Sequence, residues 1–167
     1  MSDATKGQRR AATTGMVAGF AATTMLFSAL LSAYVVRRGV SDDWTRLNIP
    51  SPLYFSLVAG PAVSVLVDIA RRRRTGSNAG LLLCAAAVSL VFVGTHVHTW
   101  RELAHSGTAS SDFLFVFSAT IVLYAGGAVP PLIAAGLRNR RPVSTAYYWH
   151  YLNVLWMLLL AFLHVVR

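Results

Sequence analysis

The sequence has few charged residues, and long stretches of it contain none. Asp, Glu, Lys and Arg make up 13% of the 167 residues, whereas about a quarter is usual in a soluble domain. Five stretches lack all four residue types and together hold 123 residues: 11–36, 47–67, 75–100, 113–137 and 142–166. This composition excludes an ordinary water-soluble domain, because such stretches have no charged surface to present to water.

The sequence also has a single cysteine, Cys84, inside one of these stretches. One cysteine cannot form an intramolecular disulfide, and cysteine-based metal motifs need more than one. The stretches contain no serine–histidine–acid constellation, no paired carboxylates and no glycine-rich phosphate-binding loop. We therefore expect no catalytic, metal or cofactor-binding centre in this chain.

Each uncharged stretch is long enough to cross a membrane as a helix. The hydrocarbon layer is roughly 30 Å thick, and a helix that crosses it needs about 20 apolar residues. We predict an all-α, polytopic membrane protein: a bundle of five transmembrane helices that forms one domain over residues 11–167, after a polar cytoplasmic tail of residues 1–10. The predicted spans are about 11–36, 50–70, 78–100, 113–137 and 145–166. The first stretch is much longer than the apolar core of a secretory signal, so we interpret it as a span.

The remaining charges are distributed unevenly between the two ends of the spans. The formal net charge is +9. If five helices alternate in direction, ten of the 15 cations fall on one side: Lys6, Arg9, Arg10, Arg71, Arg72, Arg73, Arg74, Arg138, Arg140 and Arg141. The positive-inside rule then places the N-terminus in the cytoplasm and the C-terminus on the periplasmic or extracellular side. We interpret the basic clusters as topology determinants and lipid-headgroup contacts, and we expect no nucleic-acid partner.

Small and polar residues in the spans predict how the helices pack. The segments between the spans are short, near 38–50, 71–77, 101–112 and 138–146. Helices that follow each other in sequence should therefore be neighbours. Thr24, Ser28 and Ser32 recur every four residues, and this face of small hydroxyl-bearing side chains should contact protein. In the second span, Gly60-Pro61 predicts a local kink.

Few ionisable side chains lie within the spans, where a charged group is costly. Asp68 lies three and four residues before Arg71 and Arg72, and this spacing predicts an ion pair at the end of the second helix. His96 and His98 are two residues apart, so they should point to nearly opposite sides of the third helix.

The fifth span carries polar side chains along one face of an otherwise apolar helix. This stripe follows helical spacing and should face protein rather than acyl chains. Its members are His150, Asn153, Met157 and His164. Four aromatic residues near the ends of spans are predicted to be anchors at the membrane interface: Trp44, Trp100, Tyr148 and Trp149.

Three segments carry motifs of a known family: MLFSALLSAYVVRR at 25–38, FVGTHVHTWREL at 92–103 and YYWHYLNVLW at 147–156. In this order and spacing they resemble the third, fifth and last helices of subunit III of the haem–copper oxidases. The third segment is the most specific, since it is similar to the family signature Tyr-Trp-His-x-x-Asp-x-x-Trp. The resemblance covers about residues 22–167 and corresponds to the short, five-helix form of the family.

The resemblance implies a non-catalytic accessory subunit of a bacterial haem–copper terminal oxidase, a multi-pass protein of the cytoplasmic membrane. It implies oxidase subunits I and II and phospholipid as partners, with the haems and copper of oxygen reduction and proton pumping held by subunit I. The chain itself would support assembly, stability and lipid packing, and the electron donor, cytochrome c or quinol, stays open. The residues expected to make lipid and subunit-packing contacts are Trp100, Arg101, Trp149, His150, Asn153, Trp156, Thr24, Ser28 and Ser32.

The sequence departs from the family pattern at titratable positions. The membrane-buried glutamate of the family falls at Thr23, and the aspartate of the last-helix signature falls at Asn153. An amide still forms hydrogen bonds but carries no charge. This pattern favours assembly and lipid packing over proton handling.

Two alternatives stay open from the sequence. The first is an accessory subunit of a nitric oxide reductase, whose subunit III-like proteins are also short. The second is an independent b-type cytochrome or small transporter, in which His96 or His98 would pair with His164 to ligate a haem.

Overall fold

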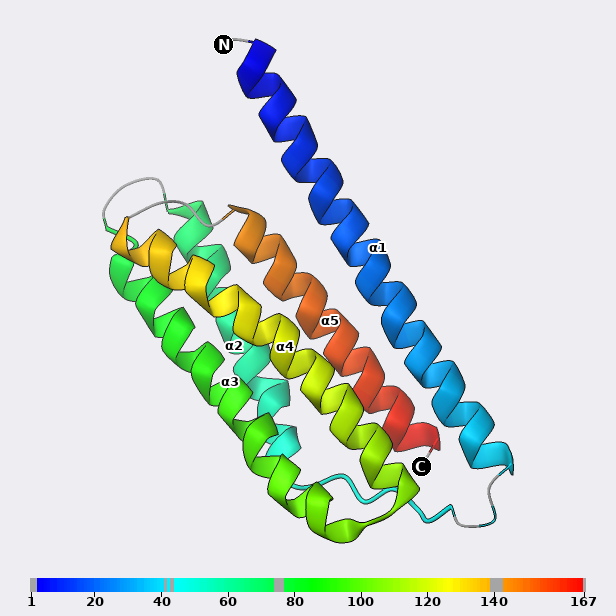
Figure 1. Cartoon of the computed structure of the whole chain (residues 1–167). Coiled ribbons are helices and arrows are strands. Elements are labelled where there is room, and N and C mark those ends of the chain that lie inside the picture. The colour runs from blue at the N-terminus through cyan, green and yellow to red at the C-terminus, as the bar shows by residue number, and fades with distance from the viewer. Residues whose placement is uncertain (1–2, 41, 43, 74–76, 139–142, 167) are drawn as a thin grey trace. The chain divides into compact units, whose positions relative to one another are not determined.

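The structure is a computed structural model that describes residues 3–40, 42, 44–73, 77–138 and 143–166. Its five α-helices are α1 (Asp3–Val40), α2 (Pro52–Arg72), α3 (Ala79–Ser106), α4 (Ala109–Leu137) and α5 (Val143–Val166) (Figure 1). Each helix contains a stretch long and apolar enough to cross a membrane. The predicted all-helical fold with five candidate spans is therefore confirmed for the described residues. The direction of the helices across the membrane stays a prediction.

Helix α1 forms one unit of its own, and α2–α5 form a second. Helix α1 begins at Asp3, so residues that we expected in a polar tail are helical. Most residues of that segment are good helix formers, and no proline interrupts it. Within α1, the hydroxyl groups of Thr23 and Thr24 donate to the carbonyl oxygens of Gly19 and Phe20, each over 2.9 Å. These bonds satisfy both hydroxyl groups inside the helix.

Helices α2–α5 form a closed ring in which each helix packs against two others. α3 packs against α2 and α4, and α5 packs against α4 and α2 (Figure 1). The prediction that sequential helices are neighbours is therefore confirmed from α2 to α5. The contact between α2 and α5 closes the ring, and all four helices contribute fully buried side chains, among them Leu53, Phe92, Phe117 and Trp149.

The connection between α3 and α4 is much shorter than we predicted. α3 continues to Ser106, and Gly107 ends it with a φ of 58°, in the left-handed region that glycine adopts without steric cost. Thr108 then caps α4, since its side-chain oxygen accepts the backbone N–H of Ser111 at 3.4 Å. The prediction of a loop over 101–112 was wrong, because charge in that segment marks the edge of the apolar run and not the end of the helix. His105 accordingly lies in the last turn of α3.

Candidate functional site

A buried hydrogen-bonded contact joins α5 to α2. Asn153 of α5 is 7% exposed, and its side-chain nitrogen donates to the carbonyl oxygen of Gly60 at 2.7 Å and to the hydroxyl group of Ser64 at 2.5 Å. A carbonyl oxygen only accepts, so the atom that faces Gly60 must be the amide nitrogen. Polar side chains paired in this way hold transmembrane helices together, because lipid offers them no partner.

Gly60 leaves the space that the Asn153 side chain occupies. A Cβ atom at position 60 would overlap the Oδ1 atom of Asn153 and would lie 3.4 Å from the ring of Phe92. From the sequence we interpreted this glycine as part of a kink, and a bend of α2 at this point stays a prediction. In the structure, the missing side chain of Gly60 permits the close approach of α5.

A second contact lies one turn away on the same pair of helices. The Nε1 atom of Trp156 donates to the hydroxyl group of Ser56 at 2.6 Å, and this hydroxyl group donates to a carbonyl of the preceding turn at 2.5 Å. The α2 residues recur every four positions and therefore share one face of that helix. We call the whole set the polar seam: Ser56, Gly60, Ser64, Asn153 and Trp156, all of them buried.

Helix α3 places a buried histidine beside the polar seam. His96 is fully buried, and its Nδ1 atom lies 2.8 Å from the carbonyl oxygen of Phe92, so Nδ1 carries the proton. The centre of its ring is 4.6 Å from that of Phe92 and 4.8 Å from that of Trp156. Its Nε2 atom has no hydrogen-bond partner among the described residues. His98 is exposed, which confirms that the two histidines point to opposite sides.

These side chains are suited to packing more than to reaction chemistry. The polar seam holds an amide, two hydroxyl groups and an indole, which do not form a pair of acid and base or of nucleophile and base. The ring of His96 lies against aromatic rings from its own helix and from α5. Within the described part of the chain, no three His, Cys, Asp or Glu residues are placed to hold a metal ion.

Trp149 extends the aromatic packing beside the polar seam. Its side chain is fully buried, and its ring meets the ring of Phe92 edge-on, with centres 6.2 Å apart. Its Nε1 atom has no hydrogen-bond partner in the part of the chain that the structure describes. The prediction that Trp149 is an anchor at the membrane interface was wrong, because it lies on the same inward face of α5 as Asn153 and Trp156.

The C-terminal end of α2 carries the predicted ion pairs. Oδ1 of Asp68 accepts from Nε and Nη2 of Arg71 at 2.9 and 2.6 Å, and Oδ2 accepts from Nε of Arg72 at 2.5 Å. The Nε2 atom of His150, on α5, lies 4.0 Å from Oδ1. The His150 side chain is 46% exposed, so this member of the α5 stripe is not the buried group that we expected.

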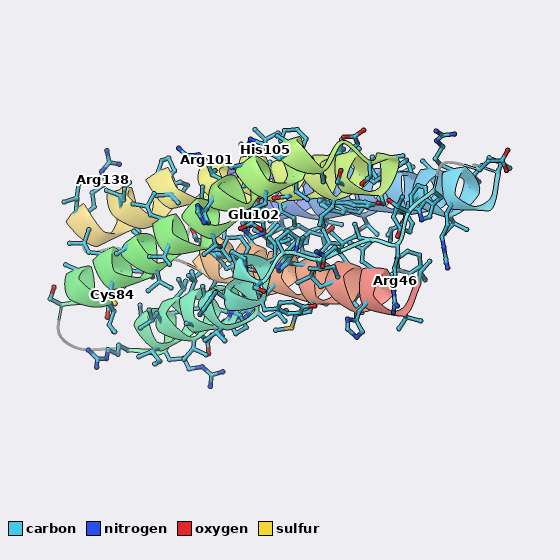
Figure 2. The ribbon with its side chains drawn as sticks, turned by 90° about the horizontal axis from the view of Figure 1, so that it is seen from below. Arg46, Cys84, Arg101, Glu102, His105 and Arg138 are labelled. Atoms are coloured by element: carbon cyan, nitrogen blue, oxygen red, sulfur yellow. The ribbon has the colours of Figure 1, made fainter. Side chains whose placement is uncertain are left out.

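The other predicted site residues lie elsewhere. The Nε1 atom of Trp100 donates to the hydroxyl group of Ser118 at 3.0 Å, which ties α3 to α4, whereas Arg101 is exposed near the end of α3 (Figure 2). Three of them lie on α1, and their contact with protein stays a prediction: Thr24, Ser28 and Ser32. Of the nine predicted residues, the structure brings together Trp149, Asn153 and Trp156.

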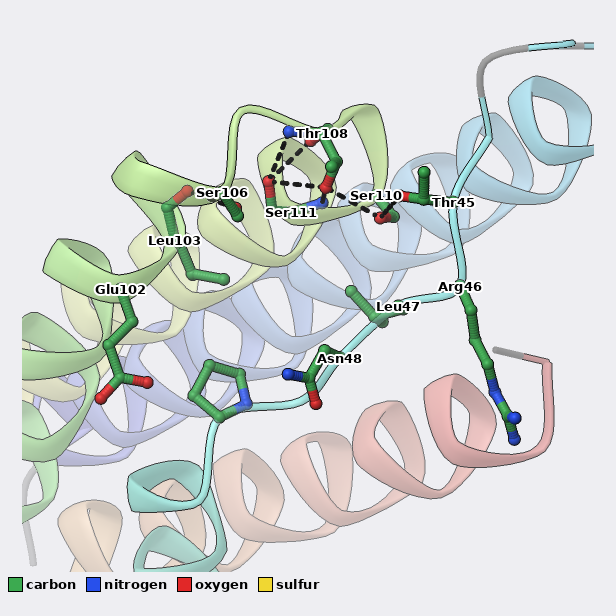
Figure 3. Close-up of a pocket in the computed structure, with 11 residues that line it drawn as sticks. Thr45, Arg46, Leu47, Asn48, Glu102, Leu103, Ser106, Thr108, Ser110 and Ser111 are labelled. Atoms are coloured by element: carbon green, nitrogen blue, oxygen red, sulfur yellow. Dashed lines mark hydrogen bonds between the residues drawn. The ribbon is translucent and has the colours of Figure 1, made fainter.

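A cavity of about 200 Å³ lies where α3 ends and α4 begins, under the segment before α2. The hydroxyl group of Ser110 lies 3.4 Å from that of Thr45 and 3.2 Å from that of Thr108. The charged lining residues Arg46 and Glu102 lie on opposite sides of the close-up, and their side chains do not point toward each other (Figure 3). The hydroxyl groups fasten the segment before α2 to the start of α4, and the two charges do not converge on a ligand.

No family model matches the chain. The chain is similar to a cytochrome c oxidase subunit 3. This relative, from Thermostichus vulcanus, is 21% identical over 173 residues, which cover 91% of this chain and 86% of the relative. The likeness extends over nearly the whole chain, so it supports the resemblance to subunit III and a place among multi-pass membrane proteins.

Two of the three segments that resemble subunit III, 92–103 and 147–156, meet inside the four-helix unit. Residues 147–156 supply Asn153 and Trp156 of the polar seam, and residues 92–103 supply His96, whose ring lies against that of Trp156. The resemblance thus falls on side chains that pack helices of this chain against one another.

The α2 side of the polar seam was missed from the sequence. Ser56, Gly60 and Ser64 form a pattern of small residues at four-residue spacing, which is typical of close contacts between membrane helices. This signal was present, but it does not say which helix approaches.

Replacing Trp156 by phenylalanine should lower the free energy of unfolding by about 1 kcal/mol more than replacing Trp149 by phenylalanine. Both indoles are buried, but only that of Trp156 has a hydrogen-bonded partner, Ser56, among the described residues. Thermal unfolding of the two variants in mild detergent makes this comparison. Equal losses of stability would show that the bond to Ser56 contributes nothing.

Proposed function

We propose that this chain is a non-catalytic accessory subunit of a haem–copper terminal oxidase, similar to subunit III, in a bacterial cytoplasmic membrane. The observation that carries this proposal is the likeness to cytochrome c oxidase subunit 3 over 91% of the chain. In this function the chain binds oxidase subunits I and II and phospholipid, and it supports the assembly, stability and lipid packing of the complex. Oxygen is reduced at the haems and copper of subunit I.

The contacts inside the four-helix unit agree with a structural function. Asn153 and Trp156 donate to α2, and Trp100 donates from α3 to α4, so these polar groups stabilise the bundle itself. Polar groups in membrane helices are costly unless they are paired. A bundle held together in this way presents a preformed surface to its partner subunits. Less conformational entropy is therefore lost when they bind.

Isolation of the tagged full chain from its own membrane in mild detergent tests the proposal. Mass spectrometry of the intact complex should show a haem–copper catalytic subunit bound to this chain, and a Soret band should remain with that subunit after the two are separated. Recovery as a lone, stable bundle would refute the proposal. A complex with the catalytic subunit of a nitric oxide reductase would assign the chain to that enzyme, and a Soret band that stays with the isolated chain would make it a cytochrome.

A further inference from the structure

Two adjacent glycines on α4, Gly126 and Gly127, are followed one turn later by two adjacent prolines, Pro130 and Pro131. In an α-helix each carbonyl oxygen accepts from the N–H group four residues later, and proline has no N–H group. The carbonyl oxygens of Gly126 and Gly127 therefore lose the donors that the regular helix would supply. Two neighbouring acceptors are thus freed inside α4.

These acceptors lie on an open face of α4. Gly127 and both prolines are exposed, and Leu123, one turn before Gly127, is 74% exposed. No described atom lies within 4 Å of where a Cβ would be at Gly126 or Gly127. Because the glycines have no side chains, another helix could approach the backbone closely here. We call this surface the α4 patch: Leu123, Gly126, Gly127, Pro130 and Pro131.

The depth of the α4 patch decides what can supply the missing donors. Gly127 lies ten residues, about 15 Å, from the nearer end of the candidate span Ala109–Leu137, and so well inside a hydrocarbon layer roughly 30 Å thick. Acyl chains have no N–H or O–H group, and lipid headgroups lie at the edge of this layer. A backbone acceptor exposed to acyl chains stays unpaired, which is costly. The α4 patch is therefore better suited to protein than to lipid.

The α4 patch is also a poor match for a second copy of itself. None of its five residues has a side-chain donor, and the hydroxyl group of the nearby Thr120 already donates to the carbonyl oxygen of Val116 at 2.8 Å. Two copies related by a two-fold axis would bring acceptors against acceptors. The favourable arrangement is seen where α4 meets α5, since the hydroxyl group of Tyr148 donates to the carbonyl oxygen of Tyr124 at 2.9 Å.

We propose that the α4 patch docks a transmembrane helix of the partner catalytic subunit. This helix places a small residue against the two glycines, and its hydroxyl or amide side chain donates to a freed carbonyl oxygen. Docking then pairs an acceptor that the separated chain leaves exposed. The identity of the partner rests on the proposed function, whereas the surface and the kind of contact do not.

Leucine substitutions at Gly127 and Gly94 test this surface in the tagged full chain, isolated from its own membrane in mild detergent. Both glycines are exposed with open space at the Cβ position, but the carbonyl of Gly94 keeps a donor because His98 has a backbone N–H group. Gly127→Leu should lower the amount of catalytic subunit retained per tagged chain roughly fivefold or more, and Gly94→Leu should not change it. Thermal unfolding of the separated chains checks that both variants fold. Equal retention by the two variants would overturn the proposal.

Pro131→Ala tests the hydrogen bond without adding bulk. Alanine restores an N–H group that donates to the Gly127 carbonyl within α4, so the Tm of the separated chain should rise. Retention of the catalytic subunit should nevertheless fall by a factor of roughly two or more, because the acceptor no longer needs a partner. A higher Tm with full retention would mean that the prolines only shape the helix, and the proposal would fail. This variant also decides the outcome if Gly127→Leu does not fold.

A photoreactive benzophenone amino acid in place of Leu123 identifies the occupant of the α4 patch. A cross-link to a haem–copper oxidase catalytic subunit supports both the docking surface and the proposed function. A cross-link to the catalytic subunit of a nitric oxide reductase supports the surface and refutes the oxidase. Cross-links confined to lipid, to α1 or to a second copy of the chain overturn the docking surface, even where the catalytic subunit is co-purified.

Discussion

Replacing Gly60 by alanine should destabilise the four-helix unit by about 1–3 kcal/mol, as is usual for overpacked cores. The new methyl group would take the place of Oδ1 of Asn153 and would lie 3.4 Å from the ring of Phe92. Asn153 can avoid this overlap only by turning away, which breaks its bonds to the Gly60 carbonyl and the Ser64 hydroxyl group. Thermal unfolding of the purified chain, followed by tryptophan fluorescence, measures the loss.

Two further variants separate this clash from a general effect of alanine. Gly94, on α3, has no atom within 4 Å of where a Cβ would lie, so Gly94→Ala should leave stability unchanged or raise it slightly. Asn153→Ala removes the side chain that the new methyl group would overlap. The double variant with Gly60→Ala and Asn153→Ala should therefore lose less stability than the two single variants lose together. If Gly60→Ala were as stable as Gly94→Ala, or if the pair were simply additive, the proposed clash would not exist.

The five helices could be predicted because the thickness of the bilayer sets the length of an apolar run, and the cost of charge keeps that run uncharged. The ends of the helices could not, because charged residues are compatible with a helix that continues beyond the hydrocarbon layer. This is why α1 begins at Asp3 and why α3 continues to Ser106. The local signals at Gly107 and Thr108 fix the turn between α3 and α4, but the prediction followed charge and did not use them.

The α5 side of the polar seam could be predicted from the sequence, whereas the α2 side could not. Asn153 and Trp156 fall in a motif with unusual residues, whereas serine and glycine on α2 are common in any membrane helix. Asn153 and Gly60 are 93 residues apart, so their contact follows from the closure of the ring by α2 and α5. The spacing of His96 and His98 likewise predicts opposite directions, but only the packing of α3 decides that His96 faces inward.

Among substitutions in the polar seam that keep the size of the side chain, replacing Asn153 by aspartate should destabilise the four-helix unit the most. The two side chains have nearly the same shape, but a carboxylate has no N–H to donate to the carbonyl oxygen of Gly60, which can only accept. The variant would bury a negative charge next to that oxygen, where the hydroxyl group of Ser64 could turn to donate to it. A buried charge that lacks an opposite charge costs about 3–5 kcal/mol. The family that this segment resembles has aspartate here, so the result also tells whether α2 of this chain is matched to an amide.

The loss caused by Asn153→Asp should depend on pH, and the direction follows from proton binding. A protonated carboxyl group regains a donor for the Gly60 carbonyl, so the folded variant favours the protonated form more than the unfolded variant does. The folded state then binds more protons, and its stability falls as the pH rises and recovers in mild acid. Thermal unfolding at about pH 5 and about pH 8 measures this, with Asn153→Leu as the control that cannot titrate. An Asn153→Asp variant as stable as the wild type at the higher pH would mean that the amide does not donate to Gly60, because a carboxylate cannot replace that bond.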